Sequence, residues 1–430
     1  MNPRIHTAAF VALSFAGLAS AAEPQPIGKL VSLPGTVFQR AKPGETWQVV
    51  PEKGAVYADH LLLGLPGAVV ETGKGSIRLT FLGDLDKNSP NSILEPAVVL
   101  RSSKDRAVEV ELDRGRIDLT NIKDKGEVRV GLRFRNHDWR ATLENPGTSI
   151  LLELYGRWAK GTRFTTTPGP KDEPAADLTL LVRKGAVEVR HELCLHALSA
   201  PPGPALLHWE SGDAHPDTPH KLEKLPAWAS ETYTSERAKR IQETLEAFRK
   251  EAAKSPPLEV LHEFVKSDDA SKRALAVIYM GAMDDKAGLG EVLMSSRHPD
   301  TWDLAVVVTR HWLGRRAGQD QILYRYLLEK RGAKPAQAET TLQLLHSFSE
   351  EDLAHPEVYR MLVRFLDNDR LGIRGLAYWH LVRLVPDGRE LHFDPLADKE
   401  ARDKAIAQWK KLVEDKIAKG VLPPKEPSSK

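Results

Sequence analysis

The pattern of apolar and polar positions changes once along this chain of 430 residues, near Pro226. From residue 27 to 210, short runs rich in Val, Ile, Leu, Thr and Phe are separated by Gly, Pro, Asn and Asp, as is typical of strands and turns. Residues 77–81 alternate strictly, which predicts one buried and one wet face. Many short strands with frequent turns predict an antiparallel β-sandwich or β-roll rather than a parallel α/β sheet.

Beyond Pro226 the apolar positions recur at helical spacing. Four amphipathic blocks can be laid over one another, and their equivalent positions are Ala276, Ala305, Thr341 and Ala377. These positions are 29, 36 and 36 residues apart. A period of about 35 to 40 residues built from paired helices indicates an α-helical repeat. We therefore predict a HEAT-like repeat domain over residues 227–418, with irregular helical packing as the alternative.

Two segments show neither periodicity. Residues 211–226 are rich in Pro and poor in apolar residues, so we expect an extended connector between the two halves. Residues 419–430, which contain three prolines and end in Ser-Ser-Lys, are expected to form a disordered tail.

The first residues have the layout of a secretory signal peptide. Arg4 precedes an apolar stretch over residues 8–18, and small residues around Ala21 and Ala22 precede the polar Glu23. The alternative is an uncleaved anchor, but the stretch is shorter than the ~20 residues that span a bilayer. We predict a signal peptide over residues 1–21, and a periplasmic or secreted protein without stable membrane insertion after cleavage.

Charge and cysteine content narrow the possible partners. The chain has 61 Lys and Arg against 59 Asp and Glu, a net charge of +2, which gives no electrostatic case for binding nucleic acid. Cys194 is the single cysteine, so the chain cannot form an internal disulfide and its fold must depend on core packing.

The turns of the β half follow the order seen in a known family. The matching segments are Gly35-Thr36-Val37, Gly75-Ser76-Ile77, Gly161-Thr162-Arg163 and Lys184-Gly185-Ala186. In these features residues 27–210 resemble the periplasmic domain of FecR-type regulators, which implies a repetitive β fold. The membrane helix and the sigma-factor-binding segment of that family have no counterpart here, so the resemblance implies no sigma-regulating role. Residues 201–204 and 406–411 also resemble exported proteins of planctomycete-type bacteria, and this implies no mechanism.

The segment from His191 to His196 invites comparison with a zinc-protease motif. That motif needs two histidines four residues apart on one helical face. Five residues place them roughly 140° apart around a helix and on opposite faces of a strand that continues from Val187. The glycines from Gly67 to Gly75 likewise miss the spacing of a phosphate loop and predict a hairpin turn. We predict no metal site and no cofactor.

Aromatic residues supply the remaining candidates. Exposed aromatic side chains can stack on sugars or anchor a protein partner. Trp139 has polar sequence neighbours, while Arg157 and Arg163 flank Trp158 in a segment with two glycines. We predict that Trp139, Trp158, Arg157 and Arg163 bind a ligand.

Two interaction-type folds without a catalytic motif predict a binding or scaffold protein of the bacterial envelope rather than an enzyme. Its partner would be an envelope protein or a glycan. The alternative is an envelope hydrolase that acts on glycan or cell-wall material, with its site between the two domains. A deep pocket that joins two carboxylates, or a histidine and a carboxylate, beside Trp139 or Trp158 would favour the hydrolase.

Overall fold

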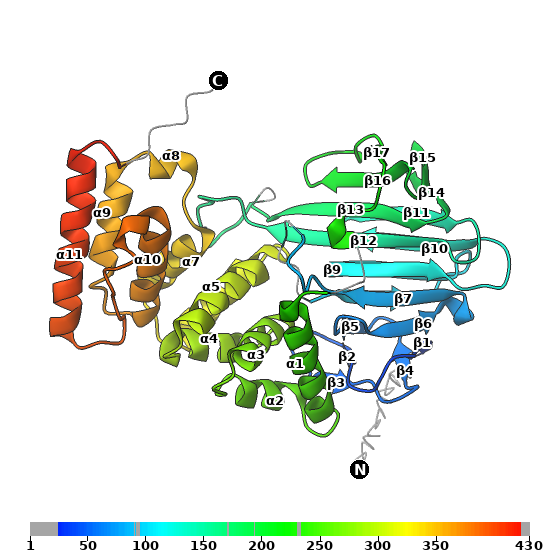
Figure 1. Ribbon diagram of the computed structural model, residues 1–430, viewed down its shortest axis with the longest axis horizontal. Coiled ribbons are helices and arrows are strands. Elements are labelled where there is room, and N and C mark those ends of the chain that lie inside the picture. Colours follow the sequence, from blue (N-terminus) through cyan, green and yellow to red (C-terminus); the bar gives the residue numbers. More distant parts are fainter. Residues whose placement is uncertain are drawn as a thin grey trace, which may run out of the picture.

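The structure is a computed structural model that describes residues 25–89, 91, 95–169, 172–192, 194–229 and 234–422. The predicted signal peptide lies outside these residues, as do residues 423–430 of the predicted tail. A large mixed β-sheet comes first and a helical region follows, as the change in periodicity predicts (Figure 1). No described helix combines the length and the apolar character needed to cross a membrane.

Seventeen strands form one connected hydrogen-bonded network in the described residues. Their bounds are β1 Pro26–Leu30, β2 Val37–Arg40, β3 Gln48–Val49, β4 Ala55–Tyr57, β5 Leu61–Gly64, β6 Val69–Thr72, β7 Ile77–Leu82, β8 Ala97–Arg101, β9 Val108–Asn121, β10 Val128–Phe134, β11 His137–Leu143, β12 Ser149–Arg157, β13 Ala175–Lys184, β14 Ala186–His191, β15 Cys194–Ser199, β16 Gly203–Glu210 and β17 His220–Leu222.

The α-helices of the described chain all follow the sheet. Their bounds are α1 Glu236–Ala252, α2 Pro257–Phe264, α3 Ala270–Ala282, α4 Lys286–Ser295, α5 Pro299–Gly314, α6 Gln319–Glu329, α7 Pro335–His346, α8 Glu350–Leu353, α9 Pro356–Phe365, α10 Leu371–Leu384 and α11 Lys399–Ala418.

Strand β9 connects the two halves of the sheet. Its first part pairs with β8 and β10, and its second part pairs with β7 and β12. Gly115, where the pairing changes, has a φ of +77°, a left-handed conformation that glycine adopts at little cost. The β9–β10 pair is parallel, whereas all other described pairs are antiparallel, so the prediction of a purely antiparallel sheet is wrong at this point.

The two halves of the sheet pack their apolar faces around one core. The predicted alternation over residues 77–81 is confirmed, because Ile77, Leu79 and Phe81 are fully buried and Arg78 is exposed. Gly73–Gly75 form the turn between β6 and β7, which pair antiparallel as predicted for a hairpin, whereas Gly67 precedes β6.

The helical region is a succession of packed helix pairs. The four superimposed positions lie on α3, α5, α7 and α10, and each of these helices packs on the next. Each also packs on the helix before it, namely α2, α4, α6 and α9. Arg273 and Arg374 stand three residues before Ala276 and Ala377, and both guanidinium groups donate to two carbonyls of the preceding turn. The predicted pairing of helices is therefore present at these four places.

Two predicted boundaries need correction. The connector over residues 211–226 contains β17, which pairs with β16, so part of it belongs to the sheet. In the predicted tail, residues 419–422 follow α11, and Leu422 is only 5 % exposed and packs into the helical core. The apolar side chain of Leu422 therefore fixes residues 419–422 against the helical core.

The sheet and the helices also share a core. Phe38 and Leu63 from the sheet pack with Phe248 of α1 and Tyr279 of α3, and the rings of Phe38 and Phe248 lie 5.7 Å apart. Figure 1 shows α1, α2 and α3 beside β2, β3 and β5. The two halves therefore meet in a packed interface and are not merely joined by a connector.

Candidate functional site

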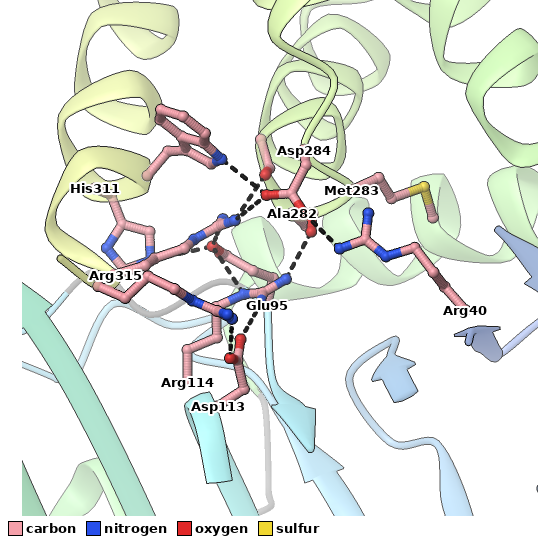
Figure 2. A network of polar contacts seen from close by, with 12 residues as sticks. Arg40, Glu95, Asp113, Arg114, Ala282, Met283, Asp284, His311 and Arg315 are labelled. Carbon is pink, nitrogen blue, oxygen red and sulfur yellow. Dashed lines mark hydrogen bonds and ion pairs between the residues drawn. The ribbon is translucent and has the colours of Figure 1, made fainter. Parts of the chain in front are cut away.

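The carboxyl end of α3 is the polar centre of the interface between sheet and helices. Its last carbonyl oxygens have no partner within the helix and carry partial negative charge. Arg315 donates to the Gly281 oxygen at 2.8 Å and Arg114 donates to the Ala282 oxygen at 2.6 Å. Residues from the sheet and from the end of α5 thus cap the same helix (Figure 2).

The next residue, Asp284, continues this set of contacts. Its carboxylate accepts from Arg40 at 2.5 Å and from the Trp312 indole at 2.8 Å. Burial alone would raise the pKa of Asp284, but the charges of Arg315, Arg114 and Arg40 outweigh it and hold that pKa below its usual range. Asp284 is therefore an ionised member of the interface rather than a simple turn residue.

Glu95 occupies the opposite side of the same cluster. Its carboxylate pairs with Arg315, with His311 Nε2 at 3.1 Å and with Arg114 at 3.9 Å. Burial opposes ionisation, yet His311, Arg315 and Arg114 together lower the pKa of Glu95 to about 2. His311 and Arg315 can both reach Glu95 because they lie one helical turn apart around the end of α5.

These contacts define what we call the junction network. Its members are Arg40, Glu95, Asp113, Arg114, Asp284, His311 and Arg315. Its three carboxylates face three buried guanidinium groups, so the charge inside the interface is balanced. Buried ions that are paired in this way fix a geometry, and removing one partner is strongly destabilising. The junction network therefore holds the helices in place on the sheet.

A pocket of about 250 Å³ opens beside the junction network, where the end of β12 meets α5, α7 and α10. Its walls include Trp158, Arg310, His311, His346 and Trp379. The volume lies below the roughly 300–1,000 Å³ of pockets that hold drug-sized ligands. One sugar ring or one amino acid is the size of ligand that it suits.

Aromatic pairs fix two walls of this pocket. The rings of Tyr155 and His311 stack at 5.3 Å, and those of Trp158 and His346 stack at 5.0 Å. The Trp158 indole also donates to the Leu313 carbonyl at 3.1 Å, so its orientation is set by α5. Burial lowers the pKa of His346 to about 4, which keeps its ring neutral near pH 7. The pocket is therefore lined by aromatic rings whose orientations are fixed by their neighbours.

Two glycines allow strand and helix to come this close. A Cβ atom on Gly156 would lie 2.3 Å from the Gly314 oxygen, and one on Gly314 would lie 2.7 Å from the Gly156 oxygen. Neither position can carry a side chain unless β12 and α5 move apart. The pocket wall formed by Trp158 depends on this contact, because Trp158 follows Gly156 by two residues.

Arg310 is the charged group of the pocket that stands apart. Its guanidinium lies over the Trp379 ring at 5.2 Å, and it forms no ion pair or hydrogen bond with the described residues. Burial and the charge of Arg383 lower its pKa, whereas Tyr155 raises it. No described carboxylate pairs with this guanidinium, so it is free to pair with an anion that enters the pocket.

The four predicted ligand-binding residues have different positions. Trp158 and Arg157 line the pocket together. Arg163 lies further along the same segment, and its guanidinium pairs with Asp352 at 2.7 Å, so it joins this segment to α8. Trp139 is 0 % exposed in the core of the sheet, packed edge-on against Phe134. The expectation that Trp139 meets an external ligand is wrong, because it lies on the buried face of β11 while the adjacent Asp138 and Arg140 point the other way.

The histidine segment also requires correction. It does not continue as one strand: β14 ends at His191, β15 begins at Cys194, and the two pair as a hairpin. Val189 and His196 lie opposite each other in this hairpin, so His191 and His196 share a face. Among the described residues, His191, Glu192 and His215 form a group with donor atoms within 4.8 Å of one another. This group could hold a metal ion.

Sequence reasoning missed most of the pocket residues. Glu95, Tyr155, His311, His346 and Trp379 come from distant segments, so no local motif connects them. One signal was available: on α5, His311 and Arg315 follow Val308 at helical spacing, on a face whose other members are apolar. Charged groups on an apolar face predict buried partners, although not which ones.

Comparisons with known proteins find no relative of this chain. No family model matches the chain, and neither a curated protein nor a solved structure matches it. The function has to be argued from the residues themselves.

Proposed function

We propose that this chain is an exported binding protein of the bacterial envelope, and that its pocket holds a small ligand with a carboxylate. An acidic sugar unit of an envelope glycan has the right size and chemistry. In the same proposal the sheet is FecR-like, the helical region is HEAT-like, and their outer surfaces contact an envelope partner. The observation that carries the proposal is Arg310, a half-buried guanidinium without a carboxylate partner among the described residues, in a pocket with aromatic walls.

Physical chemistry supports an anionic ligand in preference to a neutral one. A guanidinium forms strong, directional hydrogen bonds with a carboxylate, particularly where water is partly excluded. The flat faces of Trp158 and Tyr155 suit the apolar face of a sugar ring. The junction network fixes the elements around the pocket, so little ordering is required when a ligand binds.

Calorimetric titration with glucuronate, and with glucose as the neutral counterpart, tests this proposal. We expect glucuronate to bind and glucose to bind at least tenfold more weakly, since a charge-assisted hydrogen bond contributes about 1.5–3 kcal/mol. Arg310→Gln should weaken glucuronate binding by a similar factor. Arg383→Gln is the matched control, because Arg383 stacks on the same Trp379 but pairs with Asp303 and does not line the pocket. Equal binding of both sugars, or no effect of Arg310→Gln, would contradict the proposal.

A hydrolase is the second candidate, and the pair of His311 and Glu95 beside Trp158 favours it. Glu95, with a pKa of about 2, would stay ionised and orient His311, whose Nδ1 has no partner among the described residues. His311 could then accept a proton from water. Glu95 is the only carboxylate among the described residues that line the pocket, whereas glycosidases use two. Hydrolysis of an ester group on a glycan fits this arrangement better than cleavage of a glycosidic bond.

Product analysis separates the two candidates. If the chain is a hydrolase, incubation with O-acetylated envelope polysaccharide should release acetate, and His311→Asn should abolish the release. If it is a binding protein, the polysaccharide should be recovered unchanged. Export has its own test: protein from the envelope fraction should begin at Ala22 or Glu23, and an unprocessed chain in the cytoplasm would contradict this part of the proposal.

A further inference from the structure

A second cluster of titratable groups lies at one end of the sheet, formed by strands distant from the pocket. His191 ends β14, and Trp139 of β11 is its direct neighbour in the sheet. His137 begins β11 two residues before Trp139 and so lies on the same face. His215 approaches from the segment after β16, with its ring 5.7 Å from that of His191. We call His137, His191, Glu192, His196 and His215 the histidine cluster.

From this geometry we propose that His191, Glu192 and His215 form a binding site for a divalent transition-metal ion, with zinc as the best fit. Their donor atoms lie within 4.8 Å of one another. Zinc bonds of about 2.0–2.1 Å place tetrahedral ligand atoms roughly 3.3 Å apart, so a modest closure would complete the site. Two imidazoles and one carboxylate form a ligand set that zinc accepts, and it leaves a fourth position for water or a ligand.

The environment of the His191 side chain favours a role as a metal ligand over a purely structural role. The side chain is 2 % exposed, yet its Nδ1 is buried without a hydrogen-bond partner among the described residues. Buried polar groups in native proteins are nearly always paired, and an unpaired one calls for an explanation. A metal ion supplies that partner. His196, on the same face, also has a buried nitrogen without a described partner and is placed to support or replace a ligand.

The turn that carries Glu192 provides an independent observation. Glu192 has a φ of +48°, in the left-handed region where a tight hairpin prefers Gly or Asn. A glutamate in this position is held in a conformation that its residue type disfavours. Such strain is common where a side chain is required for function. Here it brings the carboxylate next to the two imidazoles.

The surroundings would shield a bound ion on one side. Phe134 and Trp209 pack against His137, with the rings of His137 and Trp209 4.5 Å apart, and Trp139 packs against His191. His215 is exposed and belongs to the segment between β16 and β17, so it can move toward His191 as the ion enters. Apolar packing on one side and the movable His215 on the other would give an accessible site with a defined geometry.

Zinc titration of the chain without a polyhistidine tag tests the proposal. We expect one zinc ion per chain by calorimetry and elemental analysis, with His215→Ala weakening binding at least tenfold. His215 is exposed, so this variant should fold. His220→Ala is the matched control, since His220 lies five residues further on at the start of β17, faces Asp217 at 3.7 Å and is outside the donor group. It should bind zinc as the unmodified chain does.

A spectroscopic measurement distinguishes this site from adventitious binding by other histidines. Cobalt(II) bound by His191, Glu192 and His215 should give the intense visible bands of a four- or five-coordinate ion, and His191→Asn should remove them. If the unmodified chain binds no zinc when zinc and chain are mixed at equal concentrations, the proposal is overturned. The same holds if His220→Ala weakens zinc binding as much as His215→Ala, or if cobalt shows only a weak octahedral spectrum.

Discussion

Two clusters of ionisable side chains in this molecule contain buried groups, and they are built in different ways. In the junction network the carboxylates of Glu95 and Asp284 each meet more than one guanidinium group, and two of those groups, on Arg114 and Arg315, also cap the end of α3. In the histidine cluster, ring nitrogens of His191 and His196 lack partners among the described residues. The first cluster joins two parts of the chain, whereas the second lies within one part.

This difference distinguishes buried polar groups that stabilise the fold from buried polar groups that are available to bind a ligand. In the junction network every carboxylate is taken up by guanidinium groups, and the unpartnered atoms there, Nδ1 of His311 and Nε of three arginines, belong to side chains that already pair through another nitrogen. Buried polar atoms without partners lower stability, and they persist where something else supplies the missing interaction. By the same criterion, Arg310 in the pocket resembles the histidine cluster more than it resembles the junction network beside it. Substitutions in the junction network should therefore lower stability far more than substitutions in the histidine cluster.

The largest effect is expected from breaking the junction network. Arg315→Leu removes one of the partners of Glu95 and one cap of α3, so the buried Glu95 and the partly buried Asp284 each lose a positive charge. We expect the free energy of unfolding to fall by about 3–5 kcal/mol, as for other buried pairs that lose one member. Urea denaturation followed by circular dichroism measures it.

The neighbouring arginine provides the control for this variant. Arg316 pairs with Asp113, but its side chain is 51 % exposed. Arg316→Leu should lower stability by about 1 kcal/mol at most, because solvent screens the pair. Equal effects of both substitutions would mean that pairing inside the junction network does not matter.

A smaller effect is expected on acidification, from a histidine with one paired and one unpaired nitrogen. His346 Nδ1 lies 3.2 Å from the Thr162 carbonyl, while its Nε2 is buried without a partner among the described residues. Burial lowers the pKa of His346 from 6.5 to about 4. Between these pH values His346 is therefore protonated in the unfolded chain but not in the folded chain. The free energy of unfolding must fall as the pH drops from 6.5 to 4.

The size of this loss follows from the shift itself. At 1.36 kcal/mol per pKa unit, His346 should account for roughly 3 kcal/mol between pH 6.5 and pH 4. His346→Asn keeps a donor near Thr162 but cannot be protonated, so its unfolding free energy should depend less steeply on pH in this window. An unchanged slope would show that other groups control the acid response.

The contrast between the two clusters also explains what could be predicted from sequence. Periodicity is a local property, so the order of sheet and helices and the equivalence of Ala276, Ala305, Thr341 and Ala377 could be read directly. The parallel β9–β10 pair could not, because alternation along a strand is the same for either direction of its neighbour. Leu422 was missed since one apolar residue gives no periodic signal.

The sites were less predictable for a related reason. Trp158 and Arg157 were found because they adjoin each other in sequence, and they do line the pocket. Glu95 and His311 meet only through the packing of α5 on the sheet, which no spacing along the chain encodes. The histidine segment was judged by the geometry of a continuous strand, and a turn at Glu192 reversed that conclusion by placing His191 and His196 on one face. A single turn residue can thus change the chemistry of a motif.

The smallest effect on stability, and the sharpest test of the comparison, is expected at His191. His191→Leu replaces a buried ring with an unpaired nitrogen by an apolar side chain, so no partner is left behind. In the presence of a chelator, we expect the unfolding free energy to change by less than about 1 kcal/mol, far less than for Arg315→Leu. With zinc at 100 times its dissociation constant, the unmodified chain should gain about 2.7 kcal/mol and the variant should gain nothing. A loss of more than 2 kcal/mol without zinc would show that His191 is structural, and the two clusters would then not differ in kind.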